Sequence, residues 1–178
     1  ADLVISALQK CIRRADEYTA TRMAYELYIT STFHEEKMWN RLLVISVEDI
    51  GFGNTDAPIF VKTMFDLHKE YNYGDGDRTI FFIHAIRYLC RCKKERSSDN
   101  LKNVIMKENE RGIIPEIPDF AIDMHTIKGR ERGRDVFYFL DEASKVMPLW
   151  EEYDDSYRQE YYKWCQRELE EEKENNEK

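Results

Sequence analysis

Residues 35–51 read EEKMWNRLLVISVEDIG, and they carry the strongest structural signal in the chain. Apolar side chains recur here at the three- and four-residue spacing of an α-helix, too densely for a helix that faces solvent on most sides. They are Met38, Trp39, Leu42, Leu43, Ile45 and Ile50. Gly51 follows the last of them, where a glycine commonly ends a helix. The pattern predicts a central helix over residues 35–50.

The same helical period runs through most of the chain, with little of the alternation that is typical of strands. We expect further helices over 2–15, about 19–32, about 56–67, 77 to about 90, 97 or 98 to about 110, about 130–146 and about 154–172, and loops at YNYGDGD (71–77) and GIIPEIPD (112–119). The two prolines of the second loop exclude a continuous helix there. The fold class predicted is all-α, with about seven to nine packed helices.

Length and composition indicate one globular domain. The chain has 178 residues, of which 42% are hydrophobic, enough to bury a core. We expect a single domain over residues 1–165 and an acidic, disordered tail over 166–178, because QRELEEEKENNEK is polar and low in complexity.

Charge and cysteine content exclude several classes of function. The net charge of -8 opposes non-specific attraction to a polyanion. Four cysteines (Cys11, Cys90, Cys92 and Cys165) show no zinc-binding spacing, and no apolar run approaches the ~20 residues of a membrane span. We expect a cytoplasmic protein with no metal, no cofactor and no membrane partner.

The stretch SVEDIGFGNTDAP (46–58) contains two acids and a Gly-x-Gly, but it matches neither phosphate-loop pattern. Its glycines suit the end of one helix, and Thr55 to Pro58 suit the start of the next. Glu48 and Asp49 lie near a helix C-terminus, where the helix dipole disfavours negative charge. A basic side chain is therefore expected beside them.

Three segments together resemble the C-terminal region of the MgsA/RarA family of AAA+ ATPases: LVISALQKCIRRAD (3–16), MAYELY (23–28) and RLLVISVEDIGFGNTDAP (41–58). RSSDN (96–100) extends the resemblance more weakly to about residue 100, and residues 113–165 diverge from the family's pattern. The residues that match the family's motifs are Ser6, Ala7, Leu8, Lys10, Ile12, Arg13, Asp16, Arg41, Ser46, Glu48, Asp49, Ile50, Gly51 and Pro58.

The resemblance implies a helical domain, similar to the C-terminal domains of clamp loaders, that follows an ATPase module and joins subunits as tetramers. It also implies a role in DNA replication, recombination or repair. The chain has no Walker A, Walker B or arginine-finger motif, so the expected function is a non-catalytic oligomerisation and interaction domain. Its expected partners are a second copy, as a homotetramer or a dimer, together with DNA or replication proteins.

Two groups of residues are the candidate sites. The first is a structural motif in which Glu48 and Asp49 accept hydrogen bonds from an arginine. The candidate donors are Arg13, Arg14, Arg22 and Arg41, with Arg13 and Arg41 favoured because they lie in the matching segments. Gly51 completes this motif.

The second group lies in HTIKGRERGR (125–134), where four basic residues accompany a single acid, Glu131. Its basic members are Lys128, Arg130, Arg132 and Arg134. Arginine forks match phosphate oxygens, so DNA phosphate is the expected ligand. The alternative is that the arginines pair with acids of the chain's own surface.

Other constellations give weaker signals. HEEKM (34–38) lacks the second histidine of a zinc protease. A magnesium-dependent nucleotide hydrolase would need Glu35 and Glu36 to share a site with Glu48 and Asp49, about thirteen residues or ~20 Å along one helix. His68 and His84 are expected in the core, and Asp123 with His125 forms either an acid–base pair or a local cap.

Overall fold

The computed structural model describes residues 2–176. Every regular element among them is helical, which confirms the all-α prediction. The chain separates into two compact units, Ala1–Ile113 and Ile114–Lys178, and so differs from the single domain expected over residues 1–165. The boundary lies in GIIPEIPD, where the prolines interrupt the helical pattern.

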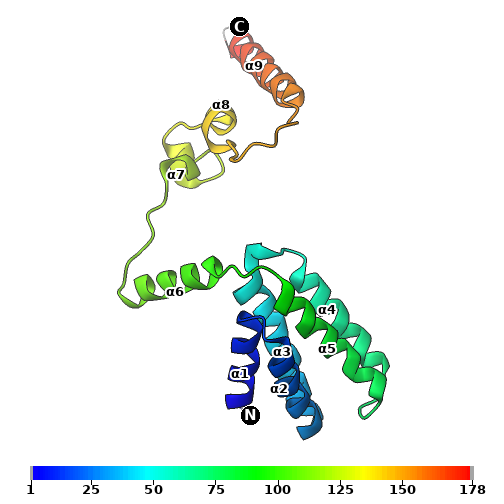
Figure 1. The fold of residues 1–178 in the computed structure, drawn as a ribbon. Helices are drawn as coiled ribbons and strands as arrows, with labels where there is room; N and C mark the ends of the chain where they lie inside the picture. Colours follow the sequence, from blue (N-terminus) through cyan, green and yellow to red (C-terminus); the bar gives the residue numbers. More distant parts are fainter. Residues whose placement is uncertain (1, 177–178) are drawn as a thin grey trace. The chain divides into compact units, whose positions relative to one another are not determined.

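The first unit begins with three helices that follow one another closely, and α4, α5 and α6 complete it (Figure 1). Its elements are α1 (Asp2–Arg13), α2 (Glu17–Thr30), α3 (Thr32–Ile45), η1 (Ser46–Ile50), η2 (Gly51–Gly53), α4 (Ala57–Leu67), η3 (His68–Glu70), α5 (Gly76–Arg91) and α6 (Ser97–Glu110). Asp16 and Ser31 cap α2 and α3 by accepting hydrogen bonds from Thr19 N and His34 N.

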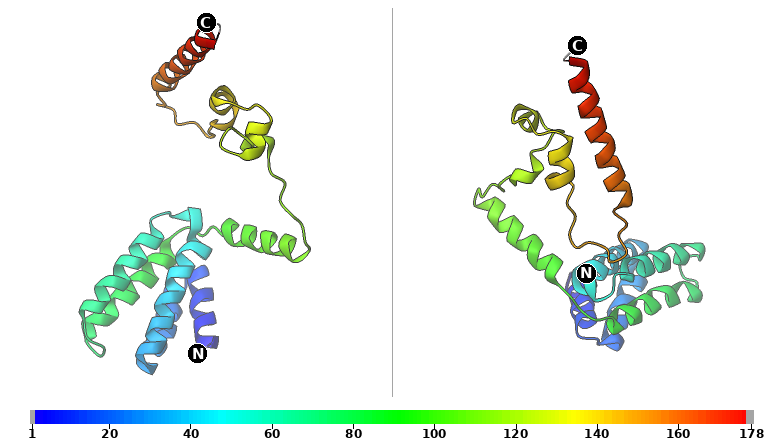
Figure 2. Two further views of the ribbon diagram at one scale, coloured as in Figure 1. Left: turned by 180° about the vertical axis from the view of Figure 1, so that it is seen from behind. Right: turned by 90° about the horizontal axis from the view of Figure 1, so that it is seen from above.

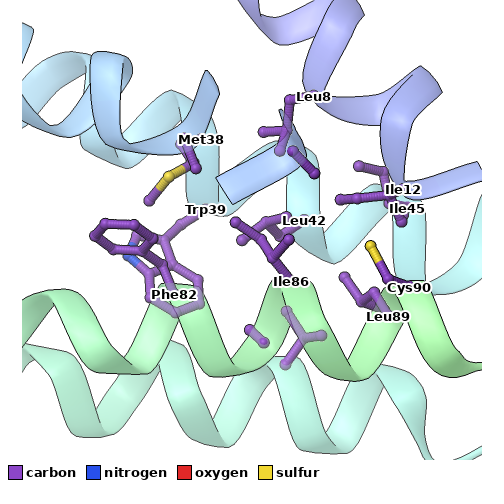
Figure 3. Close-up of a cluster of buried hydrophobic side chains, with 14 of the residues drawn as sticks. Leu8, Ile12, Met38, Trp39, Leu42, Ile45, Phe82, Ile86, Leu89 and Cys90 are labelled. Carbon is purple, nitrogen blue, oxygen red and sulfur yellow. The ribbon is translucent and has the colours of Figure 1, made fainter. Parts of the chain in front are cut away.

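The core of this unit lies where α1, α3 and α5 face one another. Figure 3 shows Leu8 and Ile12 of α1 directed toward Ile86 and Leu89 of α5. Trp39, Leu42 and Phe82 are also fully buried. The dense apolar positions found in residues 38–45 therefore do form a central helix.

The predicted helix over 35–50 ends differently from an ordinary α-helix. Its last residues, Ser46–Ile50, form a π-helical turn, η1. Gly51 follows with φ +50°, and a Cβ atom there would lie 2.6 Å from the backbone oxygen of Glu95. Only glycine fits this position, because both the conformation and the close approach exclude a side chain.

Helix α6 projects from the bundle and buries none of its own side chains (Figure 2). Three apolar residues at helical spacing, Leu101, Val104 and Ile105, are 60%, 52% and 54% exposed. We call these three residues the α6 apolar row. A helix with such a row usually packs against a partner.

The second unit contains four short elements and one long helix: η4 (Asp119–Ala121), α7 (Ile127–Glu131), α8 (Val136–Tyr138), η5 (Phe139–Ala143) and α9 (Ser156–Asn176). The helix predicted over 130–146 is wrong. Gly133 has φ +70°, and Asp135 starts a new helix by accepting hydrogen bonds from the backbone N–H groups of Phe137 and Tyr138.

Residues 166–176, which we expected to be disordered, continue α9 to Asn176. The prediction was wrong because it relied on composition, whereas the glutamates and lysines of this segment are good helix formers. Residues 177 and 178 of the expected tail lie outside the described residues. No helix within residues 2–176 is long and apolar enough to cross a membrane.

Candidate functional site

Glu48 and Asp49, the acids of the matching motif, lie in η1 at the end of α3. The Asp49 side chain is 0% exposed, and the Glu48 side chain is 21% exposed. A buried carboxylate needs hydrogen-bond donors to replace the water that it has lost. The site is defined by the groups that supply those donors.

Helix α1 supplies two of them. Arg13 Nε lies 2.5 Å from Asp49 Oδ1, and Arg13 Nη2 lies 2.8 Å from Glu48 Oε1. The amide of Gln9, one helical turn earlier, donates to Glu48 Oε1 at 3.1 Å and to Asp49 Oδ2 at 2.9 Å. One face of α1 therefore binds both acids.

The other donor is Arg96, which sequence reasoning missed. Arg96 Nη2 donates to Glu48 Oε1 at 3.3 Å and to Asp99 Oδ2 at 2.5 Å. Arg96 Nε lies 3.1 Å from Asp49 Oδ1, within ion-pair distance, but makes no hydrogen bond. The only sequence signal was the weak match at RSSDN (96–100).

Asp99 closes the cluster at the start of α6. Lys102 Nζ donates to Asp99 Oδ1 at 2.6 Å, and this bond, with the positive charges of Lys102, Arg96 and Arg13, lowers the pKa of Asp99. The Asp49 carbonyl also accepts the Glu95 N–H at 3.0 Å. We call Arg13, Glu48, Asp49, Arg96 and Asp99 the ion-pair cluster.

The ion-pair cluster joins α1, η1 and the start of α6, and each of its three acids lies within ion-pair distance of at least one guanidinium group. Such an arrangement suits a crosslink between elements, since each buried charge has an opposite partner. Within residues 2–176, no three or more His, Cys, Asp or Glu side chains are grouped so that they could hold a metal ion.

Glu35 belongs to a separate buried ion pair. Arg78 of α5 donates from Nε and Nη2 to the two carboxylate oxygens of Glu35, both at 2.9 Å, and its Nη1 donates to the carbonyls of His68 and Tyr71. His68 is buried beside this pair, and burial lowers its pKa. Arg78 thus connects α3 with the turn that follows α4.

Arg41, which we expected beside Glu48 and Asp49, instead lines a cleft of about 530 Å³ between α1 and α3. The cleft is lined by Asp2, Ile5, Ser6, Gln9, Lys37, Asn40, Arg41 and Val44. Arg41 precedes Glu48 by seven residues on the same continuous helical stretch, about 10 Å along its axis, whereas Arg13 comes from α1 and contacts both acids.

The arginines of the basic segment 125–134 are largely occupied within the second unit. Arg132 Nη1 donates to Asp119 Oδ1 at 2.7 Å. Arg134 pairs with the same carboxylate, donates to the carbonyls of Asp119 and Ile122 at 2.6 Å, and stacks on Tyr138. These bonds lower the pKa of Asp119.

The other two basic residues face solvent. The Arg130 side chain makes one hydrogen bond, to the Met124 carbonyl at 3.1 Å, and the Lys128 side chain makes no hydrogen bond or ion pair within the described residues. Gly129 serves local packing, since a Cβ atom there would lie 1.7 Å from the Asp123 carbonyl oxygen. Lys128 and Arg130 are therefore the members best placed to meet an external anion.

Asp123 and His125 interact locally. The Asp123 carboxylate accepts the His125 backbone N–H at 3.0 Å and lies 2.9 Å from His125 Nδ1, contacts that lower the Asp123 pKa. The Thr126 hydroxyl donates to the Asp123 carbonyl. Together these bonds form the turn that leads into α7.

No known protein-family model matches the chain. Among curated proteins, it is similar to Replication-associated recombination protein A of Bacillus subtilis (strain 168), with 27% identity over 135 residues. The match covers 76% of this chain and 31% of that relative, so the chain spans less than a third of the relative's length. The similarity supports a relationship between this all-α chain and a replication-associated recombination protein.

Proposed function

We propose that the chain is a non-catalytic self-association and interaction domain of a protein that acts in DNA replication and recombination. The observation that best supports this proposal is the similarity to Replication-associated recombination protein A. The match extends over 135 residues and covers 76% of this chain. The segments that resemble the MgsA/RarA family, from Leu3 to Pro58, form α1 to α3 and the start of α4.

The arrangement of the acids supports a role without chemistry. A magnesium-dependent hydrolase needs several open carboxylates around one metal ion. Here Glu48 and Asp49 are bound by Arg13, and Glu35 is bound on both oxygens by Arg78. The acids that such an enzyme would need therefore belong to two separate ion-paired groups.

The α6 apolar row supports self-association. The apolar residues of α3 and α5 are mostly used in the core. The α6 apolar row is left exposed on a helix that buries none of its own side chains. We propose that α6 contributes to a homotetramer, or to a dimer, with closed symmetry.

DNA contact is the second part of the proposal. Lys128 and Arg130 are exposed on α7 and have donors available for phosphate oxygens. The net charge of -8 limits this contact to a weak, salt-sensitive one.

Calorimetric titration with ATP and magnesium tests the proposed lack of catalysis. We expect no binding heat and no release of phosphate, because the chain has no phosphate loop and its motif acids are paired. Micromolar ATP binding that disappears on replacing Glu48 with Gln would favour the nucleotide hydrolase instead.

A further inference from the structure

Helix α9 carries an exposed row of aromatic side chains. Tyr157, Tyr161 and Trp164 follow one another at spacings of four and three residues, so they lie on one face of the helix. They are 83%, 51% and 53% exposed. An exposed apolar patch of this kind commonly marks an interaction site. We call these three residues the α9 aromatic row.

A neighbouring face of α9 packs against its own unit. Arg158 donates from Nη2 to the Leu140 carbonyl at 2.7 Å, and the Tyr162 hydroxyl donates to Asp141 Oδ2 at 3.2 Å. Cys165, which follows Tyr162 on the same face, is buried. Because these contacts hold α9 by another face, the α9 aromatic row remains open to a partner.

The face that carries the α9 aromatic row continues into acidic side chains. Glu168, Glu171 and Glu172 lie four, seven and eight residues after Trp164, a spacing that keeps them on this face. None of the three forms a salt bridge with a basic side chain within residues 2–176. We call these three residues the α9 acidic row.

The α9 acidic row is unfavourable for the helix by itself. Glu168 and Glu172 are four residues apart, a spacing at which like charges destabilise a helix. The row also lies toward the C-terminal end of α9, the end at which the helix dipole favours positive charge. A cationic partner would relieve both effects, so the helix indicates the charge of the group that binds it.

One ring of the α9 aromatic row already receives a guanidinium group. Arg167 Cζ lies 4.9 Å from the centre of the Trp164 ring. In the same unit, Arg134 stacks on Tyr138 at 4.2 Å. A planar guanidinium group both stacks on a ring and is attracted by its face, whereas an ammonium group cannot stack. The aromatic side chains therefore favour arginine over lysine in a partner.

The second unit carries the net charge of the whole chain. Residues 114–178 contain 18 acidic and 10 basic residues, whereas residues 1–113 contain 17 of each. The net charge of -8 therefore belongs to the unit that contains α9. This charge attracts a cationic partner and opposes a nucleic acid, whose bases could otherwise stack on the rings. A second copy of α9 would bring the same acids and be repelled.

We infer that α9 binds an arginine-rich segment of another protein, whose guanidinium groups stack on the α9 aromatic row and pair with the α9 acidic row. This inference rests on the proposed interaction function and names the chemistry of one partner. From Tyr157 to Glu172 the helix rises about 22 Å, at 1.5 Å per residue. An extended segment of about seven residues covers the same length.

Fluorescence anisotropy on the full chain tests the inference. The probe is a labelled peptide in which arginines alternate with serines, and its two counterparts have lysines or glutamines in place of the arginines. We expect the arginine peptide to bind with an affinity that falls with salt. The lysine peptide should bind at least about threefold more weakly, and the glutamine peptide should not bind.

Two variants separate the contribution of the rings from that of the charges. Y157A/Y161A/W164A should weaken binding of the arginine peptide and remove its advantage over the lysine peptide, because the rings distinguish the two cations. E168Q/E171Q/E172Q should weaken binding of both peptides at least about fivefold and leave arginine preferred. Glutamine keeps the helix propensity of glutamate, so this variant tests the inference even if the first one does not fold.

Matched controls make the same kinds of change in the first unit. Y18A/Y25A removes exposed rings of α2, and E26Q/E36Q/E108Q removes three exposed negative charges. Both controls should bind the peptides as the wild type does. Circular dichroism of each variant shows whether it is folded.

The inference is overturned if the arginine peptide does not bind, if the wild type binds the arginine and lysine peptides equally, or if a control weakens binding as much as its α9 counterpart. A folded Y157A/Y161A/W164A variant that still prefers arginine would also overturn it. So would single-stranded DNA that binds through the α9 aromatic row when the arginine peptide does not.

Self-association is measured separately on the same variants. If Y157A/Y161A/W164A abolishes self-association and the wild type does not bind the arginine peptide, the row joins copies of this chain and the inference is wrong. Binding of the arginine peptide by a strictly monomeric wild type would contradict the proposed self-association and leave the inference intact.

Discussion

Arg13 and Asp49, 36 residues apart in the chain, form an ion pair in which Arg13 Nε lies 2.5 Å from Asp49 Oδ1. The Asp49 side chain is fully buried, whereas that of Arg13 is 26% exposed. Loss of the arginine would leave a buried charge with fewer donors, while loss of the aspartate would leave a cation that water can reach. Removing Arg13 should therefore lower the free energy of unfolding more than removing Asp49.

A clean measurement of this pair needs a probe in the first unit. Trp39 is buried there, whereas Trp150 and Trp164 lie in the second unit and are largely exposed. Replacing Trp150 and Trp164 with Phe leaves Trp39 fluorescence as the reporter of unfolding in urea. The stability predictions below refer to this background.

Asp49→Ala should lower the free energy of unfolding by about 3 kcal/mol, the lower end of the cost of breaking a buried ion pair, because Arg13 and Arg96 keep other acids. Glu48→Ala should cost about 1 kcal/mol, since Glu48 is partly exposed. Urea titration measures both. Asp66→Ala, which removes an exposed pair with Lys62, serves as the control. A result in which Asp49→Ala costs no more than Asp66→Ala contradicts the structural role of the cluster.

Arg78→Lys should destabilise the first unit by about 3 kcal/mol despite conserving charge. The Arg78 guanidinium binds both oxygens of Glu35 and two carbonyls, and an ammonium group cannot reproduce this geometry. The same urea titration gives the value. Arg87→Lys is the control because Arg87 makes only a half-exposed pair with Glu17. Equal effects of the two substitutions would refute the prediction.

The first unit should lose stability as the pH falls below about 6.5. Burial lowers the pKa of His68 from its ordinary value of 6.5, so the unfolded state takes up a proton more readily than the folded state. The contribution of neutral His68 to the free energy of unfolding is therefore fully present above pH 6.5. It is lost as the pH decreases toward the pKa of His68 in the folded state, by at most about 1.4 kcal/mol per pH unit. Urea titrations from pH 7.5 to 5 measure the slope.

His68→Gln removes this titration and should flatten the pH dependence over that window. His125→Gln, at an exposed position of the second unit, should not change it. A wild-type slope that persists in His68→Gln would assign the pH dependence to other groups.

The central helix could be predicted from the sequence because its signal is local. Apolar residues at helical spacing from Met38 to Ile45 require a buried helix in almost any all-α arrangement. The helix predicted over 130–146 failed for an equally local reason, since Gly133 and Asp135 interrupt a pattern whose apolar positions alone looked continuous.

The ion-pair cluster could be predicted only in part. The helix dipole argument showed that Glu48 and Asp49 need cationic partners, but not which ones. Arg96 lies 48 residues from Glu48, and no local pattern connects two positions so far apart. Arg41 was misplaced because the prediction relied on its place in a matching segment, although it lies seven residues before Glu48 on the same helical stretch, about 10 Å along the axis.

Contact with DNA should depend on Lys128 and Arg130 rather than on Arg134. Replacing Lys128 and Arg130 together with Ala should weaken binding to duplex DNA and reduce the salt slope by roughly 0.9 for each phosphate that is no longer bound. Anisotropy titrations at several salt concentrations measure this. If the affinity and the salt slope both remained unchanged, Lys128 and Arg130 would be exposed to solvent without contacting DNA. Arg134→Ala should instead destabilise the second unit, because it removes one of the two arginines that pair with Asp119.

Self-association is the part of the proposed function on which the rest depends, and light scattering coupled to size exclusion measures it without a ligand or a partner. We expect a mass near four times, or else twice, the 21.4 kDa of one chain at micromolar concentration. L101D/I105D, which places charges in the α6 apolar row, should return the mass to that of one chain while circular dichroism still shows a helical protein. A wild-type mass of 21.4 kDa at every concentration measured would contradict the proposed self-association.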